Sequence, residues 1–182
     1  MKQDKSFLRK KYLQIRQNKQ KSIKNFNFNL IFNLIKKKFG NKNIIIAGYY
    51  PSYYEVDILK FLKLAAKKNF RLALPVIESS KDMSFQPWSC MEPLYVNKFG
   101  ILEPKKSKKI IPNVILVPLV AFDKNLNRIG YGKGYYDRAL KKNKKETISV
   151  GIAYSFQKCR TIPANRHDFK LDYIFTDQGI IS

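Results

Sequence analysis

The stretch 127–138 combines glycines and cations at a spacing that suits a bound phosphate. Three glycines alternate with larger residues at positions 130, 132 and 134, and Arg128 and Lys133 lie among them. Glycine adopts positive φ angles and lets a ligand approach the backbone closely. A helix expected to begin at Tyr135 would offer free N–H groups and the positive end of its dipole to an anion. The stretch therefore predicts a nucleotide-phosphate site, with a glycine-rich surface turn as the alternative.

The carboxylate of Asp137 adds a hard oxygen ligand of the kind that Mg²⁺ prefers. The loop is not a Walker A motif, because Gly134 follows Lys133 where that motif has Ser or Thr, and Asn127 stands where it has Gly. The spacing of a dinucleotide-binding fingerprint does not fit either. Once the two cations and the carboxylate are included, a phosphate site is favoured over a simple turn.

Alternating helices and strands are expected to position this loop. Apolar residues at helical spacing predict helices, and near-continuous apolar runs predict strands covered on both faces. The expected helices cover 4–18, 22–39 (capped by Gly40), 56–69 and 135–142, and the expected strands cover 44–49, 71–75, 114–120, 147–153 and 173–176, with short extended pieces at 83–85 and 94–96. This alternation, without a repeat or linker, predicts one α/β domain over residues 1–182, with a largely parallel sheet and helices on both faces.

The charge balance is strongly basic, with 36 Lys and Arg against 13 Asp and Glu, a net charge of +23. Such a surplus attracts anions, nucleic acid included, so a basic nucleic-acid-binding module stays open as an alternative. Arginine, which contacts phosphates and bases with a planar fork, supplies only 7 of the 36 cations. A solvated lysine coat is therefore favoured, and no nucleic-acid partner is expected.

Composition excludes several other classes of protein. With 45% hydrophobic residues the chain can form a core, unlike a disordered or collagen-like sequence. Two cysteines, Cys90 and Cys159, are too few for a disulfide framework or a cysteine-based metal site, which indicates a reduced, intracellular protein. The longest apolar runs, 44–50 and 114–122, are too short to span a membrane, and no targeting segment is visible, so no membrane partner is expected.

Six ordered motifs carry a resemblance that extends over nearly the whole chain. They are Lys5-Ser6-Phe7-Leu8-Arg9, Glu55-Val56-Asp57, Met83-Ser84-Phe85-Gln86-Pro87-Trp88, Gly100-Ile101-Leu102-Glu103-Pro104, the run Val117–Asp123 that leads into the glycine loop, and His167-Asp168-Phe169-Lys170-Leu171-Asp172. In this order and spacing they resemble the 5-formyltetrahydrofolate cyclo-ligase family, also called 5,10-methenyltetrahydrofolate synthetases. Any one of them alone would be a weak signal.

The resemblance implies a fold, a reaction and its partners. The expected fold is a three-layer α/β/α sandwich with a mainly parallel sheet, resembling the NagB/RpiA/CoA transferase-like fold. The expected reaction converts 5-formyltetrahydrofolate and ATP to 5,10-methenyltetrahydrofolate, ADP and phosphate, with Mg²⁺. ATP would phosphorylate the formyl oxygen, and N10 of the folate would then close the ring. A cytoplasmic monomer of one-carbon metabolism is expected, with a reduced folate, polyglutamylated or not, as substrate. A different small-anion enzyme on the same scaffold is the alternative.

The resemblance also implies which residues bind ATP. On the first helix, Lys5 and Arg9 lie one turn apart and could hold phosphates together, although a solvated basic face that includes Arg16 is the plainer reading. Of the loop residues, Arg128, Lys133 and Tyr135 are expected to take part in catalysis. The full ATP-binding set is Lys5, Ser6, Phe7, Leu8, Arg9, Arg128, Ile129, Gly130, Tyr131, Gly132, Lys133, Gly134, Tyr135 and Tyr136.

A pterin ring needs an aromatic wall and a carboxylate that accepts its edge N–H groups. Tyr50, Glu55 and Trp88 are expected on the folate side, with Tyr131 and Tyr135 between folate and ATP. Glu55 follows a strand, where α/β sheets place ligand-binding groups. For Trp88, the single tryptophan, a buried core position is the alternative.

Asp137 and Asp172 are the Mg²⁺ ligands that the resemblance implies, with a turn position as the alternative for Asp172. His167 is expected to support Asp172 and not to act as a base, since no Ser or Cys nucleophile pairs with it. Two departures from the family pattern, Asn165 and Lys170, lie beside this motif and bear on its local geometry.

Overall fold

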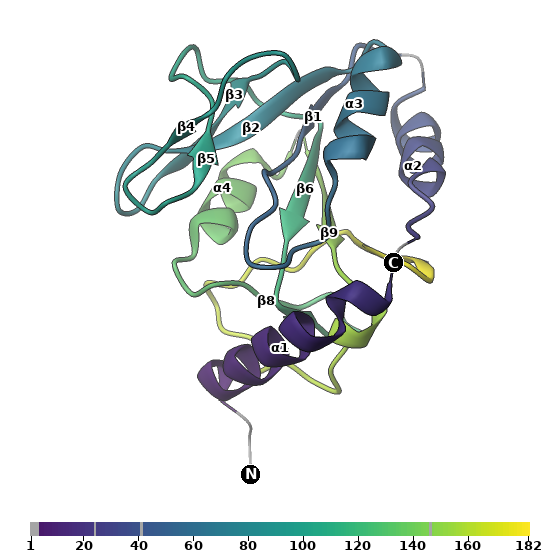
Figure 1. Ribbon diagram of the computed structural model, residues 1–182, viewed down its shortest axis with the longest axis vertical. Coiled ribbons are helices and arrows are strands. Elements are labelled where there is room, and N and C mark those ends of the chain that lie inside the picture. The colour runs from purple at the N-terminus through teal and green to yellow at the C-terminus, as the bar shows by residue number, and fades with distance from the viewer. Residues whose placement is uncertain (1–3, 24, 41, 146) are drawn as a thin grey trace.

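Within residues 4–23, 25–40, 42–145 and 147–182, which the computed structural model describes, one sheet contains seven strands. Its spatial order is β11-β10-β9-β6-β1-β2-β3 (Figure 1). The inner strands pair in parallel, and the edge strands β3 and β11 are antiparallel to their neighbours. The seven strands are β1 (Ile45–Ala47), β2 (Arg71–Ile77), β3 (Met83–Pro87), β6 (Val114–Pro118), β9 (Ile148–Ile152), β10 (Tyr173–Thr176) and β11 (Gly179–Ile181). The predicted α/β class with a mainly parallel sheet is confirmed.

Helices cover both faces of the sheet (Figure 1). The α-helices are α1 (Lys5–Lys19), α2 (Asn29–Phe39), α3 (Leu59–Lys67) and α4 (Tyr135–Asn143). Two short 3-10 helices are η1 (Gln20–Ser22) and η2 (Ser155–Gln157). Helices α2 and α3 pack on one face and α4 packs on the other. No helix in the described part of the chain is both long and apolar enough to cross a membrane.

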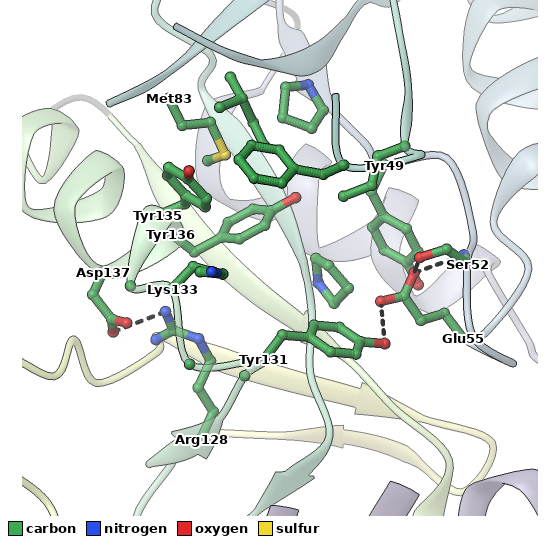
Figure 2. A pocket seen from close by; sticks show the side chains of 18 of the residues that line it. Tyr49, Ser52, Glu55, Met83, Arg128, Tyr131, Lys133, Tyr135, Tyr136 and Asp137 are labelled. Atoms are coloured by element: carbon green, nitrogen blue, oxygen red, sulfur yellow. Dashed lines mark hydrogen bonds and ion pairs between the residues drawn. The ribbon is translucent and has the colours of Figure 1, made fainter. Parts of the chain in front are cut away.

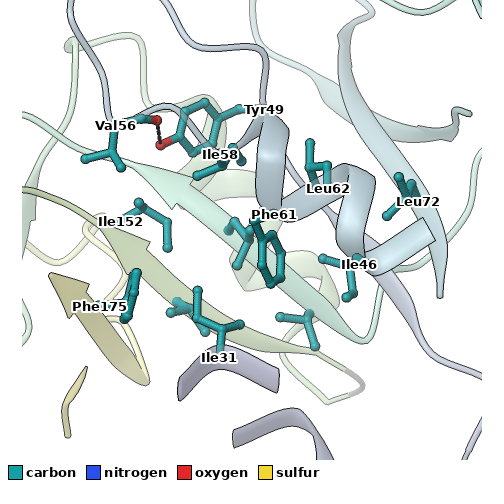
Figure 3. Packing of buried hydrophobic residues seen from close by; sticks show 14 of the residues in the cluster. Ile31, Ile46, Tyr49, Val56, Ile58, Phe61, Leu62, Leu72, Ile152 and Phe175 are labelled. Carbon is teal, nitrogen blue, oxygen red and sulfur yellow. Dashed lines mark hydrogen bonds between the residues drawn. The ribbon is translucent and has the colours of Figure 1, made fainter. Parts of the chain in front are cut away.

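The larger core lies between the sheet and helices α2 and α3 (Figure 3). Ile31 of α2 and Phe61 of α3 are fully buried against Ile46 of β1 and Phe175 of β10. On the opposite face, Leu140 of α4 is buried in a second cluster. The continuous apolar runs of the inner strands follow from this arrangement, since each strand buries both of its faces.

Two small hairpins extend from the sheet. Strands β7 (Ala121–Phe122) and β8 (Arg128–Ile129) pair beside α1, and β4 (Tyr95–Val96) and β5 (Leu102–Glu103) form an arm near β2. A third small cluster of apolar residues joins α1 to the β7–β8 hairpin through Leu8 and Ile129. The glycine loop therefore begins at a hairpin that the N-terminal helix holds in place.

The observed boundaries depart from expectation mainly before α2. The expected helix over 22–39 begins at Asn29, although Gly40 caps its end with a φ of 62° as predicted. Phe26 and Phe28 instead pack against the core from the irregular segment before α2, and position 24 lies outside the described residues. Strands β5, β7, β8 and β11 were not expected, because runs of two or three residues are too short to establish a period.

Candidate active site

A cavity of about 800 Å³ opens at the carboxyl ends of the parallel strands, where α/β sheets place their ligands (Figure 2). Its lining comes from α1, the loop after β1, the ends of β2 and β6, the β4–β5 arm, the glycine loop and α4. Segments far apart in the sequence thus meet around one space. The volume suits a cofactor or a small substrate, which are bound in cavities of about 300–1,000 Å³.

The glycine loop forms one side of this cavity. Gly132 and Gly134 have φ angles of 95° and 68°, a backbone conformation that residues other than glycine rarely adopt. Arg9 donates from Nε to the carbonyl oxygen of Gly130 at 2.8 Å, and its guanidinium lies beside Gly132. Lys5 forms an ion pair with Asp168, which also lines the cavity. The structure therefore brings both predicted cations of α1 together with the loop.

The predicted residues Arg128 and Asp137 form an ion pair in which Arg128 is buried and Asp137 is partly exposed (Figure 2). Arg128 Nη2 lies 2.9 Å from Asp137 Oδ1, and Arg128 Nη1 donates to the carbonyl oxygen of Phe169 at 2.7 Å. The backbone N–H of Phe169 donates to the same Asp137 oxygen. Burial lowers the pKa of Arg128, and the Asp137 charge opposes that shift. The pair fixes the start of α4 against the 165–172 segment.

Glu55 is the buried carboxylate on the other side of the cavity (Figure 2). Its Oε1 accepts a hydrogen bond from the Tyr131 hydroxyl at 2.9 Å, and its Oε2 accepts one from the Ser52 N–H at 2.9 Å. Burial raises the pKa of Glu55, while the bonds from Ser52 and Tyr131 and the charge of Arg16 oppose the rise. The carboxylate is thus oriented before any ligand enters.

Aromatic side chains cover the space between these polar groups. Tyr49, Tyr50, Tyr135 and Tyr136 line the cavity together with Met83. Such rings can enclose a flat heterocycle and leave its polar edge to a carboxylate. A site that holds phosphates at one end and a planar ring at the other is compatible with this lining.

Trp88, predicted on the folate side, lies in the core and does not line the cavity. Its backbone N–H pairs with Leu72 at the amino end of β2, whereas the cavity lies at the carboxyl ends. The indole is 8% exposed and donates to the carbonyl oxygen of Glu92 at 3.3 Å. The core alternative for this residue is the one that the structure shows.

Asp172, predicted as a metal ligand with Asp137, is also at the wrong end of the sheet. Its Oδ2 accepts hydrogen bonds from Ser149 N and Oγ at 2.8 and 2.7 Å, at the start of β9. The preceding acid of the same motif, Asp168, lines the cavity instead, as does His167. The geometry therefore does not support Asp172 as a metal ligand or His167 as its support.

The two departures from the family pattern have different surroundings. The N–H of Asn165 donates to Asp168 Oδ2 at 2.6 Å, so residue 165 helps to orient the acid that reaches the cavity. Lys170 is exposed. Partial burial acts to raise the pKa of Asp168, but the bonds from Asn165 and Lys5 lower it overall.

Three residues of the first motif point away from the cavity. Leu8 is buried against the β7–β8 hairpin, Phe7 is exposed, and Ser6 bonds to Asp4. Helical geometry explains this, since Lys5, Arg9 and Leu13 are spaced four residues apart and form the row on α1 that faces the cavity. The prediction of Ser6, Phe7 and Leu8 as ATP-binding residues is therefore not supported. All the predicted loop residues from Arg128 to Tyr136 line the cavity, together with Tyr50 and Glu55.

Several lining residues were not predicted. Glu103 of the β4–β5 arm accepts hydrogen bonds from Asn97 Nδ2 at 2.9 Å and from Ile77 N at 3.2 Å, and Phe99 lies beside them. Glu103 belongs to the motif at 100–104 that carries part of the family resemblance, so the sequence did contain a signal for this residue. Tyr49 and Asp168 also belong to this unpredicted set.

Comparison with known proteins shows which family has a similar sequence and fold. A family model described as the 5-formyltetrahydrofolate cyclo-ligase family matches residues 1–177. The 5-formyltetrahydrofolate cyclo-ligase of Haemophilus influenzae is 33% identical over 147 residues, covering 76% of this chain and 77% of that protein. A probable 5-formyltetrahydrofolate cyclo-ligase of Schizosaccharomyces pombe is 34% identical over 158 residues, 77% of each chain. The solved structure of Aquifex aeolicus 5,10-methenyltetrahydrofolate synthetase superposes with a TM-score of 0.79 at 35% identity, covering 97% of this chain and 91% of that one.

Proposed function

Because the chain belongs to the 5-formyltetrahydrofolate cyclo-ligase family, we propose that it converts 5-formyltetrahydrofolate and ATP to 5,10-methenyltetrahydrofolate, ADP and phosphate. The observation that carries this proposal is the meeting of two groups in one cavity. A cationic glycine loop lies on one side and the buried carboxylate of Glu55 on the other, and Tyr131 belongs to the loop and bonds to that carboxylate. We include in the proposal a cytoplasmic, monomeric enzyme.

The proposed chemistry proceeds in two steps that balance. The formyl oxygen attacks the γ-phosphorus of ATP, and the bond from that phosphorus to ADP breaks. N10 of the folate then attacks the activated formyl carbon, the phosphate leaves with the C–O bonding electrons, and N10 loses its proton. An amide-like oxygen is a poor leaving group until it is phosphorylated, which is why ATP is needed.

The protein contributes positioning and charge to these steps. Lys5, Arg9 and Lys133 lie where they can neutralise the triphosphate, and the loop backbone can donate N–H groups to it. Glu55 is placed to accept N–H groups from the pterin edge. Holding the formyl oxygen and the γ-phosphate in line is the main catalytic demand that this cavity can meet.

Asp137 and Asp168 are the residues that fit a magnesium ion. Both are carboxylates that line the cavity beside the loop, and Mg²⁺ at phosphate sites is typically bound by one or two carboxylates together with phosphate oxygens. The Oδ1 atom of Asp137 takes both protein hydrogen bonds, which leaves Oδ2 for another ligand. Held there, such an ion would supply positive charge that neutralises charge developing on the phosphate.

The direct test is to incubate the purified protein with 5-formyltetrahydrofolate, with and without ATP and Mg²⁺, and to follow the methenyl product by its absorbance. We expect product only when all three are present. Methenyl product formed equally well without ATP, or no product with all three, would contradict the proposal. The comparisons favour this activity over the two alternatives considered from the sequence, a different small-anion enzyme and a nucleic-acid-binding module.

The two cations of α1 allow a test of the nucleotide side. Removing either charge, in Lys5→Met or Arg9→Met, is expected to raise the KM for ATP about 10-fold, the usual effect of losing one hydrogen bond to a charged group. The KM for folate is expected to change less than about 2-fold, since neither residue contacts Glu55. Lys10→Met removes an exposed charge from the same helix and is the matched control. Equal effects on both substrates would contradict the assignment.

A further inference from the structure

Arg16 of α1 is a fully buried cation that the proposed chemistry does not use. Its Nη1 donates to the carbonyl oxygen of Leu119 at 3.1 Å, and its Nη2 donates to the hydroxyl of Tyr131. The guanidinium carbon lies 5.7 Å from the centre of the Tyr131 ring. Its Nε has no hydrogen-bond partner among the residues that the structure describes. A buried guanidinium with an unpaired N–H destabilises a fold, so its presence calls for a reason.

The hydrogen bond from Arg16 to a backbone carbonyl oxygen does not supply that reason. The carbonyl oxygen of Leu119 also accepts a hydrogen bond from Gln157 Nε2 at 2.9 Å, so it would keep a partner without Arg16. Of the two groups that accept hydrogen bonds from Arg16, the Tyr131 hydroxyl is the one for which Arg16 is the donor that matters. That hydroxyl belongs to the glycine loop and lies 2.9 Å from Glu55 Oε1.

The direction of these hydrogen bonds is fixed by chemistry. A guanidinium has donors and no acceptor, so the Tyr131 oxygen must accept from Arg16. The single proton of the Tyr131 hydroxyl is then free to point only toward Glu55, whose carboxylate accepts it. Arg16 therefore determines both where the hydroxyl lies and which way its proton points.

We infer that Arg16 is a positioning residue for folate, which acts through the Tyr131 hydroxyl to hold Glu55 oriented and ionised. The inference rests on the proposed function, because it takes Glu55 as the folate-binding carboxylate. It links α1, which carries Lys5 and Arg9 toward the nucleotide, to the opposite substrate. Loss of Arg16 should thus impair folate binding although the residue lies on the nucleotide-binding helix.

The surroundings of Glu55 support a specific electrostatic role. Besides Tyr131 of the glycine loop, the ionisable groups that interact with Glu55 include Tyr49 in the loop after β1, Tyr136 of α4 and Arg16 of α1. The three tyrosines are neutral at ordinary pH, since burial raises the pKa of each. Arg16 supplies the positive charge that opposes the effect of burial on Glu55.

The test compares Arg16→Met and Tyr131→Phe with the wild-type protein. Binding of 5-formyltetrahydrofolate is measured by calorimetry, and kcat/KM for folate and for ATP is measured across pH. We expect folate binding to weaken about 10-fold in Arg16→Met, the effect of one charge-assisted hydrogen bond, with the KM for ATP within about 2-fold of wild type. The acid limb of kcat/KM for folate should move to higher pH, because Glu55 loses the cation that favours its ionised form.

Tyr131→Phe should reproduce the loss of folate binding, and adding Arg16→Met to it should weaken binding by less than the product of the two single effects. Lys19→Met, an exposed charge on the same helix, is the matched control and should change nothing. Unchanged folate affinity in Arg16→Met and Tyr131→Phe, or fully multiplicative effects, would overturn the inference. A wild-type protein that binds folate without turnover would instead contradict the proposed reaction, and the binding comparison would still decide the role of Arg16.

Discussion

Asp137→Ala is expected to lower kcat about 100- to 1,000-fold, the usual loss when a group that stabilises developing charge is removed. Asp137 holds the buried Arg128 by a hydrogen bond of 2.9 Å and lines the cavity beside the glycine loop. Its loss would leave Arg128 held only through Nη1 to the Phe169 carbonyl oxygen and would remove a ligand proposed for Mg²⁺. Both effects act on the triphosphate during transfer and not on folate binding. Single-turnover formation of methenyl product at saturating ATP measures the change.

Asp172→Asn is the matched control, because it changes the other predicted metal ligand. The Asp172 carboxylate bonds to Ser149 at the start of β9, away from the cavity. This variant should lower the melting temperature while kcat per folded molecule stays within about 2-fold of wild type, as expected for a site remote from the chemistry. Wild-type turnover in Asp137→Ala at saturating Mg²⁺ would contradict the assignment of Asp137, and a large loss of kcat in Asp172→Asn would restore Asp172 to the site.

Patterns in the sequence located the central sheet well because burial dictates them. Strands such as β6 are enclosed on both faces, so their residues form nearly continuous apolar runs. The β7–β8 hairpin has two residues in each strand and no such run, although it supports the glycine loop. Its position depends on packing against α1, which is a tertiary contact between distant parts of the chain.

Two of the predicted site residues that do not line the cavity share one physical cause. Trp88 and Asp172 both lie at the amino ends of parallel strands, whereas the cavity lies at the carboxyl ends. A family motif identifies a residue but does not reveal toward which end of the sheet its side chain lies. The expectation that Glu55 lies beside the cavity agrees with the structure, because this residue belongs to the loop that follows β1 along the chain.

Arg16 could not be distinguished in the sequence from the lysines around it. Its spacing put it on a basic face near Lys5 and Arg9, where solvation is the ordinary expectation. Burial of its side chain arises from Leu119 and Tyr131, which lie more than one hundred residues away in the chain. A contact of that separation leaves no local pattern.

Glu55→Gln is expected to lower kcat/KM for folate about 10- to 100-fold, because a carboxylate hydrogen-bonded to the pterin edge is worth about 1.5–3 kcal/mol. The KM for ATP should stay close to wild type. In the wild-type protein, kcat/KM for folate should fall on the acid side through a pKa above the ordinary range of glutamate, since burial raises the pKa of Glu55. That acid limb should be absent from the variant. Glu92→Gln, an exposed carboxylate outside the cavity, is the control.

The same substitution should increase stability at neutral pH. A glutamate whose folded pKa is raised above its unfolded value of 4.5 contributes stability below that value and loses it as the pH rises through the folded pKa. At neutral pH the ionised Glu55 therefore destabilises the fold, and a neutral glutamine avoids this cost. The melting temperature of Glu55→Gln should exceed that of wild type at pH 7, and the difference should shrink as the pH falls toward 4.5. A variant that is less stable than wild type at every pH would show that Glu55 is retained for the fold and not for its ligand.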